Sequence, residues 1–233
     1  MDGTRTYLVG ARSVAVIDPG PDVHEHVRAL VVEVREASEV CVLLTHGHPD
    51  HSAAARPLAD RLGAEVLGPP LDGVVDRVLD DGDRVETDAG SLVAVHTPGH
   101  TADHLSYHWP EGDGLFVGDL LLGQGDTTWV AEYPGCVADY FDSLARVRSL
   151  PVGVLYPSHG PPLNEPSEAI DRFERHRRDR VRQVEAALAT LPSDDVDELL
   201  AFVYGDSIPP GLEGAAARSL GALVDYVKQS RES

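Results

Sequence analysis

The sequence predicts an α/β domain followed by an all-helical region. Over residues 1–166, short apolar segments alternate with amphipathic helical segments, which is the pattern of α/β proteins. Several apolar segments end directly at loops that contain histidine or aspartate, and such strand ends are where α/β sheets usually hold their sites. Pro161, Pro162 and Pro166 mark a boundary, and residues 167–233 are expected to form a small helical region.

Strands are predicted where short runs of aliphatic and β-branched residues are bounded by Gly, Pro or Asp. These runs cover residues 7–9, 14–17, 40–44, 65–67, 91–96, 106–108, 115–117 and 152–156. The run at 40–44 is apolar throughout, so we expect it to be buried on both faces of a sheet.

Helices are predicted where apolar residues recur at a spacing of three or four positions. They cover residues 23–37, 52–62, 138–149, 167–191, 194–204 and 213–227. Gly63 is expected to end the second helix, and Ser167 is expected to cap the first turn of the long fourth helix.

The chain is acidic, with 19 Lys and Arg residues against 39 Asp and Glu and a formal net charge of −20. This charge disfavours RNA as a partner, because affinity for phosphates comes largely from Lys and Arg. No apolar run approaches the roughly 20 residues of a membrane span, so no membrane partner is expected. The opening residues lack a signal-peptide pattern, and Cys41 and Cys136 lie far apart, so a cytoplasmic location is expected. The oligomeric state stays open.

The strongest chemical signal is the segment His-Gly-His-Pro-Asp-His at residues 46–51, directly after the apolar run at 40–44. Imidazole nitrogens and carboxylate oxygens are the ligands that zinc and similar metals favour. Gly47 and Pro49 favour a tight loop, from which several side chains can converge on a metal ion. A loop that is His-rich by chance is the weaker alternative at this density of ligands.

Three further residues, His100, Asp119 and His159, also follow predicted strands. Each alone is an ordinary polar loop residue. Together with the cluster, they place four ligand-bearing loops after four strands, which indicates a site for two metal ions. Two such cations would acidify a bridging water and polarise the electrophile of a substrate.

These motifs resemble those of the metallo-β-lactamase superfamily and occur in the same order. Besides the cluster, they are Thr97-Pro98-Gly99-His100-Thr101, Gly118-Asp119 and Ser158-His159-Gly160. The resemblance implies the αβ/βα sandwich, in which two mixed sheets lie between outer layers of helices. By the same resemblance, one metal binds His46, His48 and His100, a second binds Asp50, His51 and His159, and Asp119 bridges the two.

Additional segments narrow the resemblance to one branch of the superfamily. They are residues 6–10, 16–21, 99–104 and 138–140. The branch contains the mitochondrial lactamase-like endoribonuclease, its bacterial relatives, and acyl-carrier-protein thioesterases of polyketide pathways. The helical region after residue 166 resembles the small winged-helix-like C-terminal region of that branch, while residues 1–166 match the catalytic domain.

The resemblance implies a hydrolase in which a metal-bound hydroxide attacks the substrate, with Asp50 orienting the nucleophile and moving its proton. We expect two divalent ions, with Zn²⁺ favoured and Mn²⁺ or Fe also compatible with the ligands. The predicted partner is a small acyl substrate, a carboxylic thioester or ester. The first alternative is a single-strand endoribonuclease, which the net charge disfavours. The second is a single-iron sulfur dioxygenase.

Several other side chains have more than one interpretation. His104 either supports the ligands, contacts substrate or is structural. Trp129, Tyr133 and Tyr140 follow Asp119 in a Gly-rich segment and either contact substrate or pack over a helix.

Two further groups are expected to be structural. Asp18 is predicted to hold the loop beneath the metals. The arginines of the long helix are predicted to pair with acids four residues earlier, as in Glu168–Arg172, Asp171–Arg175 and Glu174–Arg178.

Overall fold

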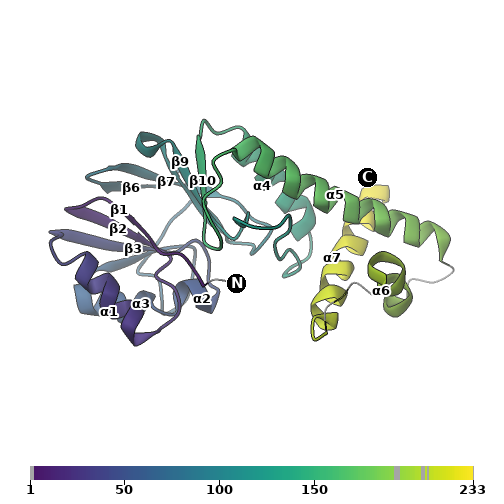
Figure 1. The fold of residues 1–233 in the computed structure, drawn as a ribbon, viewed down its shortest axis with the longest axis horizontal. Helices are drawn as coiled ribbons and strands as arrows, with labels where there is room; N and C mark the ends of the chain where they lie inside the picture. Colours follow the sequence, from purple (N-terminus) through teal and green to yellow (C-terminus); the bar gives the residue numbers. More distant parts are fainter. Residues whose placement is uncertain (1–2, 192–194, 206–207, 209, 233) are drawn as a thin grey trace.

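Two mixed β-sheets lie face to face, with helices covering the outer face of each (Figure 1). The structure, a computed structural model, describes residues 3–191, 195–205, 208 and 210–232. The helices α1 and α3 cover the first sheet, and α4 with the start of α5 covers the second. The αβ/βα sandwich implied by the sequence motifs is therefore confirmed.

The first sheet has five strands in the order β1-β2-β3-β4-β5, of which only β1 and β2 are antiparallel. The strands are Tyr7–Val9, Ser13–Ile17, Glu39–Leu43, Glu65–Gly68 and Arg77–Val78. The first four match predicted strands. The last, β5, was not predicted, because its two residues are both exposed and carry no apolar pattern.

The second sheet has the order β10-β9-β8-β7-β6, with β9 and β10 parallel and the other neighbours antiparallel. Its strands in sequence order, β6 to β10, are Arg84–Thr87, Gly90–His96, Leu105–Trp109, Gly114–Gly118 and Val154–Pro157. A 3₁₀ turn at Pro110–Gly112 joins β8 to β9.

The described helices, α1 to α7, are His24–Glu33, Pro49–Ser52, Ala55–Leu62, Cys136–Arg148, Pro166–Thr190, Val196–Tyr204 and Glu213–Glu232. The helix expected over 52–62 is divided, and the extra turn α2 starts inside the ligand cluster at Pro49, whose fixed φ suits a first helical turn. The prediction that Ser167 caps α5 was wrong, because Glu165 is the N-cap and Pro166 the first helical residue.

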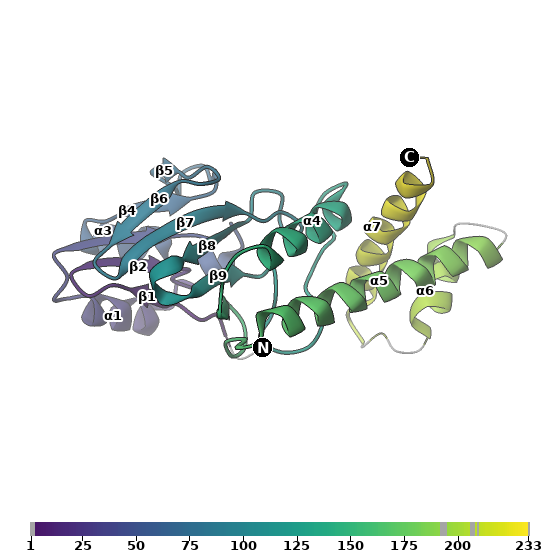
Figure 2. The ribbon, with the colours of Figure 1, turned by 90° about the horizontal axis from the view of Figure 1, so that it is seen from above.

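Three apolar clusters hold these layers together. One lies between the sheets and includes Leu43 and Tyr107, and a second lies between the first sheet and its helices. The third begins under α4, continues along α5 through Phe173 and Val184, and reaches α6 and α7. Figure 2 shows α5 running from the sandwich into the helical region. Because this core crosses residue 166, the division into two domains there stays a prediction.

None of the described helices combines the length and apolar composition that a bilayer span requires. In the described residues after 166 the structure has three helices and no strand.

The loop after β7 packs directly on α4. Gly99 has a φ of 135°, and a Cβ there would lie 2.7 Å from the Cα of Tyr140. The Ser143 hydroxyl of α4 also donates to the carbonyl of Pro98 at 2.7 Å. A side chain at position 99 would therefore meet both an unfavourable backbone conformation and a fixed neighbour.

We predict that Gly99→Ala lowers the free energy of unfolding by at least about 2 kcal/mol, since strain and a backbone clash add. Gly63→Ala is the matched control, because Gly63 also has a positive φ of 65° but has open space around it. The control should lose about 1 kcal/mol. Urea denaturation of both variants measures the difference, and equal losses would show that the contact with α4 is not limiting.

Candidate metal centre

The seven side chains predicted as ligands converge at one edge of the sandwich. The strands β3, β7, β9 and β10 end directly before the loops that carry them. Within each of three groups, the candidate ligand atoms lie within 4.8 Å of one another; the groups are His46–His48–His100, His46–His51–Asp119 and Asp50–His51–His159. The short helix α2 carries Asp50 and His51 into the site.

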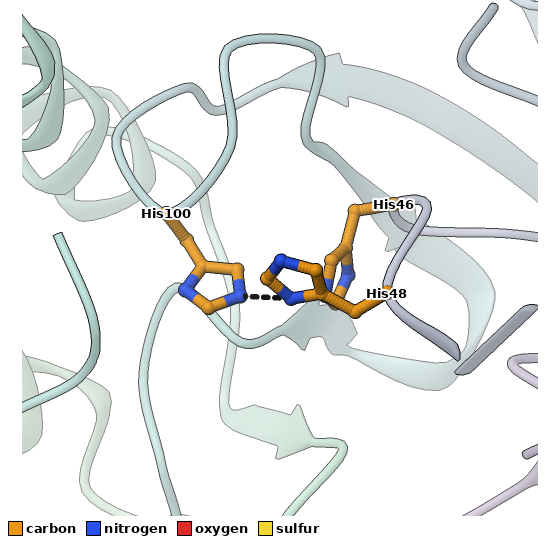
Figure 3. A group of neighbouring side chains, drawn as sticks. All are labelled: His46, His48 and His100. Atoms are coloured by element: carbon orange, nitrogen blue, oxygen red, sulfur yellow. Dashed lines mark hydrogen bonds between the residues drawn. The ribbon is translucent and has the colours of Figure 1, made fainter. Parts of the chain in front are cut away.

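In the first group, three imidazole nitrogens meet (Figure 3). His48 Nδ1 lies 3.0 Å from His46 Nε2 and 3.0 Å from His100 Nε2. Nitrogen ligands 2.0–2.1 Å from a tetrahedral zinc ion are about 3.3 Å apart. Three lone pairs this close repel one another unless a cation lies among them, so the geometry fits a metal ion.

The group Asp50–His51–His159 is similarly close-packed. Asp50 Oδ2 lies 3.3 Å from His159 Nε2 and 3.6 Å from His51 Nε2. The two groups meet at Asp119, whose Oδ2 atom lies 3.5–3.7 Å from His51, His100 and His159. One carboxylate therefore reaches both groups, as a bridging ligand would.

Each of the five candidate histidine ligands has its outward nitrogen held by an oxygen acceptor. The pairs are His46 with Thr45 Oγ1, His48 with Glu132 Oε1, His51 with Asp18 Oδ2, His100 with the Trp129 carbonyl and His159 with the Gly3 carbonyl, at 2.8–3.1 Å. An N–H donated outward leaves the other nitrogen bare and facing inward, which is the tautomer that binds a metal.

Two buried polar atoms in the site have no hydrogen-bond partner among the described residues: His51 Nε2 and Asp119 Oδ1. Buried polar atoms without partners are rare in folded proteins. A cation would satisfy both, so the residues present fit a divalent metal. Their roles as ligands stay a prediction, while their convergence is a property of the structure.

Burial and neighbouring charges shift the pKa values of these groups in opposite directions. Burial lowers the pKa of His46 well below its usual value and also lowers that of His100. Burial opposes protonation of His51 as well, but the carboxylates of Asp18 and Asp119 outweigh it and raise the pKa of His51 to about 10. Before a metal binds, both ring nitrogens of His51 would therefore carry protons at neutral pH, so His51 would differ from the neutral form that binds a metal.

This proton must leave when a metal binds, because His51 Nε2 has to be bare to act as a ligand. We predict that Zn²⁺ binding releases at least one proton at pH 7. The affinity should rise about tenfold per pH unit from pH 7 and level off above about pH 10. Calorimetric titrations in buffers of different protonation enthalpy measure the release, and an affinity independent of pH between 7 and 9 would contradict it.

Asp18 lies beneath the ligands and is fully buried. Its carboxylate accepts hydrogen bonds from the Thr45 amide and hydroxyl, from His51 Nδ1 and from the Ser158 hydroxyl, all at 2.7–2.9 Å. These contacts confirm that Asp18 holds the loop that carries the candidate ligands, and the position of metals above it stays a prediction.

His104 has no exposed surface, which favours a supporting role over direct contact with substrate. Its Nε2 atom accepts from the Asp119 amide at 3.3 Å, and its Nδ1 atom faces Thr97 Oγ1 at 2.9 Å. Burial lowers the pKa of His104 to about 3, so the ring is neutral. His104 therefore positions Asp119.

The three aromatic residues after Asp119 have different positions. Tyr140 is buried, with its hydroxyl donating to the Leu120 carbonyl, which favours packing over substrate contact. Tyr133 is half-buried and donates to Asp139. Trp129 is half-buried near His48, since its Nε1 atom donates to Glu132 Oε1 at 3.2 Å. Substrate contact stays a prediction for Tyr133 and Trp129.

Sequence reasoning missed Glu132. This carboxylate lies 2.9 Å from His48 Nε2 and is 35% exposed. A Glu in a loop 84 residues from its partner carries no pattern that would single it out.

The arginines of α5 were predicted to pair along the helix, and this was wrong for some of them. Only Glu174–Arg178 of the three expected pairs forms in the structure, and Asp171 binds Arg148 of α4 instead. Arg172 donates to the Gly125 carbonyl at 2.9 Å. These contacts join α5 to α4 and to the loop after Asp119.

Arg177 is the unexpected member of this set, because it is 3% exposed and bonds to no carboxylate in the described chain. Its Nη2 atom donates to the Thr128 carbonyl at 2.8 Å, and its guanidinium lies over the Tyr140 ring. The Thr128 hydroxyl donates to the Asp119 carbonyl, and the next carbonyl, of Trp129, accepts from His100. Arg177 thus holds the peptide that orients two candidate ligands.

We predict that Arg177→Met weakens Zn²⁺ binding about tenfold, because partners outside the ligand sphere orient the ligands themselves. The side chains are similar in size, so the fold should persist. Arg182→Met is the control, since Arg182 lies on the same helix, exposed, and bonds only to Asp179. Competition with a chelator measures the affinities. Unchanged zinc affinity in folded Arg177→Met would contradict the role.

Comparison with known proteins gives a family match over most of the sandwich. A sequence profile described as "Metallo-beta-lactamase superfamily" matches residues 2–77 and 67–159. The Beta-lactamase-like protein 2 homolog of Caenorhabditis elegans is 32% identical over 89% of this chain and 72% of its own length. An Atrochrysone carboxyl ACP thioesterase of Aspergillus chevalieri is 31% identical over 88% of this chain and 69% of its own.

Solved structures show the same fold. The metallo-beta-lactamase family protein TTHA1429 from Thermus thermophilus has a TM-score of 0.77 at 23% identity, over 98% of this chain and 89% of its own. TTHA1623, solved in a di-iron-bound form, has a TM-score of 0.57 at 30% identity, over 69% of this chain and 89% of its own.

Proposed function

Because the chain belongs to the metallo-β-lactamase superfamily and is a hydrolase of that fold, we propose that it uses two divalent metal ions to hydrolyse a carboxylic thioester or ester. The observation that carries the proposal is the position of Asp119 Oδ2, within 3.5–3.7 Å of His51, His100 and His159. One carboxylate between two ligand groups is the arrangement of a two-metal site.

The residues divide into two ligand sets. His46, His48 and His100 would hold one ion, Asp50, His51 and His159 the other, and Asp119 would bind both. Zinc suits the mixture of imidazole and carboxylate ligands, and the di-iron form of TTHA1623 makes iron the main alternative. When bound, the two cations would acidify the attacking water and stabilise negative charge on the substrate oxygen.

Asp50 is the exposed member of the ligand set. Its side chain is 52% exposed, whereas those of His51, His159 and Asp119 are at most 11% exposed. The Thr4 hydroxyl donates to Asp50 Oδ2 at 3.4 Å and leaves the other oxygen available. We therefore infer that Asp50 orients the attacking water and accepts its proton.

An acyl substrate is favoured over RNA on two grounds. The net charge of −20 gives the chain few cations with which to release counterions from a phosphate backbone. A relative that matches most of the chain is named a thioesterase.

The two described cysteines are free thiols, which supports a cytoplasmic location.

The test is turnover by the zinc-loaded protein on a panel of acyl thioesters, esters and short single-stranded RNA, with metal content measured in parallel. We predict thioester or ester hydrolysis, about two metal ions per chain, and a loss of at least about 10²-fold in Asp50→Asn. The control is Asp60→Asn, an exposed carboxylate on α3 that should leave turnover unchanged.

Near-normal turnover in Asp50→Asn would refute the role of that carboxylate. Metal-dependent cleavage of RNA that weakens steeply with salt and is lost in His48→Ala would favour the endoribonuclease instead. A single bound iron with oxygen uptake would favour the sulfur dioxygenase.

A further inference from the structure

A groove of about 290 Å³ separates the loop at residues 131–135 from α7. The α7 wall includes Gly221, which has no side chain, and Ala222, whose side chain is a single methyl group, so the groove stays open. Glu132 lines the groove and also bonds to His48, so the groove begins one residue away from a candidate metal ligand. The part of a substrate beyond its scissile bond could extend from the metal centre into this groove.

Arg218 of α7 is the cation of the groove lining. Its guanidinium lies over the Trp129 ring, with Cζ 5.2 Å from the ring centroid. Trp129 in turn donates from Nε1 to Glu132 Oε1. This cation–π contact restricts the guanidinium, and Arg218 is linked through Trp129 and Glu132 to His48.

Among the described residues, the guanidinium of Arg218 has no carboxylate partner. In the described part of the chain, no carboxylate lies within 4.0 Å of its guanidinium, although the chain carries 39 acidic residues. By contrast, Arg56, Arg146 and Arg148 each bind carboxylates at 2.6–2.9 Å. The guanidinium of Arg218 therefore retains its N–H donors for a ligand.

The ligand that best matches a free guanidinium is an anion. A guanidinium presents parallel N–H donors that match a carboxylate or a phosphate. Glu132 and Asp225 also line the groove, but Glu132 already accepts from His48 and Trp129 on one oxygen. Those donors offset part of the negative charge nearest to Arg218.

We propose that Arg218 binds an anionic group of the substrate while the scissile acyl bond lies at the metal centre. This inference rests on the proposed hydrolysis of thioesters or esters and names a feature of their substrate. The anion is either a carboxylate on the acyl side or a phosphate on the thiol side. In both cases α7, outside the sandwich, supplies a residue that determines specificity.

The experiment compares three thioesters in the zinc-loaded full chain: butanoyl-N-acetylcysteamine, which is neutral, succinyl-N-acetylcysteamine and butanoyl-coenzyme A. In Arg218→Gln, KM should rise about tenfold or more for one of the two anionic substrates, the scale of a lost charge-assisted hydrogen bond. Neither kcat for these substrates nor the KM for the neutral substrate should change much. Arg218→Lys should restore part of the lost affinity. The succinyl arm identifies a carboxylate, and the coenzyme A arm a phosphate.

Arg231→Gln, an exposed arginine at the end of α7, is the control and should change none of these values. Equal losses for neutral and anionic substrates would overturn the inference, since Arg218 would then only support Trp129. No loss for any thioester, or a loss confined to RNA, would also overturn it.

Calorimetric binding of succinate and of free coenzyme A to the same variants gives a readout that needs no turnover. If the wild-type chain binds one of these anions and Arg218→Gln does not, the anion site stands even where no thioester is hydrolysed. If thioesters are hydrolysed but neither anion distinguishes the variants, the proposed function stands and the role of Arg218 fails.

Discussion

The buried carboxylate of Asp18 is the group on which the candidate metal centre depends. It joins loops from both sheets, because Thr45 and His51 follow β3 of the first sheet and Ser158 follows β10 of the second. A buried carboxylate that lost these donors would destabilise the chain by several kcal/mol. Asp18 also has a φ of 48°, a left-handed conformation that persists only where surrounding contacts fix it. The sheets, the loops and the ligands are therefore held in place together.

The parts of this site that the sequence predicted are those whose information is local. The cluster at 46–51 states four ligands in six residues, and His100, Asp119 and His159 each follow a strand that has its own apolar pattern. Since β7, β9 and β10 run in the same direction within the second sheet, their ends bring three of these loops to one edge. The fourth loop follows β3 of the first sheet and reaches the site through the packing of the two sheets. The strand β5 was missed for the complementary reason: its pairing comes from its neighbour β4 and not from its own residues.

The residues that orient the ligands could not be predicted in this way, because their contacts join distant segments. Glu132 meets His48 across 84 residues, and Arg177 meets Thr128 across 49. A buried arginine in a helix full of charges has the same sequence pattern as an exposed one, so only the packing of α5 on α4 distinguishes Arg177. The outer contacts of the site thus come from loops far apart in the sequence and, through Arg177, from the helical region, whereas the candidate ligands follow the strand ends.

The negative charge of the site affects the binding of both metal ions and substrate. The site gathers the carboxylates of Asp18, Asp50, Asp119 and Glu132 in a chain with a net charge of −20. Such a centre repels any anion that approaches it. Two divalent cations would add four positive charges among these four carboxylates, and bound ions of this kind dominate the local field. An anionic substrate would then meet a neutralised centre and, beside it, the guanidinium of Arg218. On the proposed function, loading with metal therefore determines binding of substrate as well as the reaction itself.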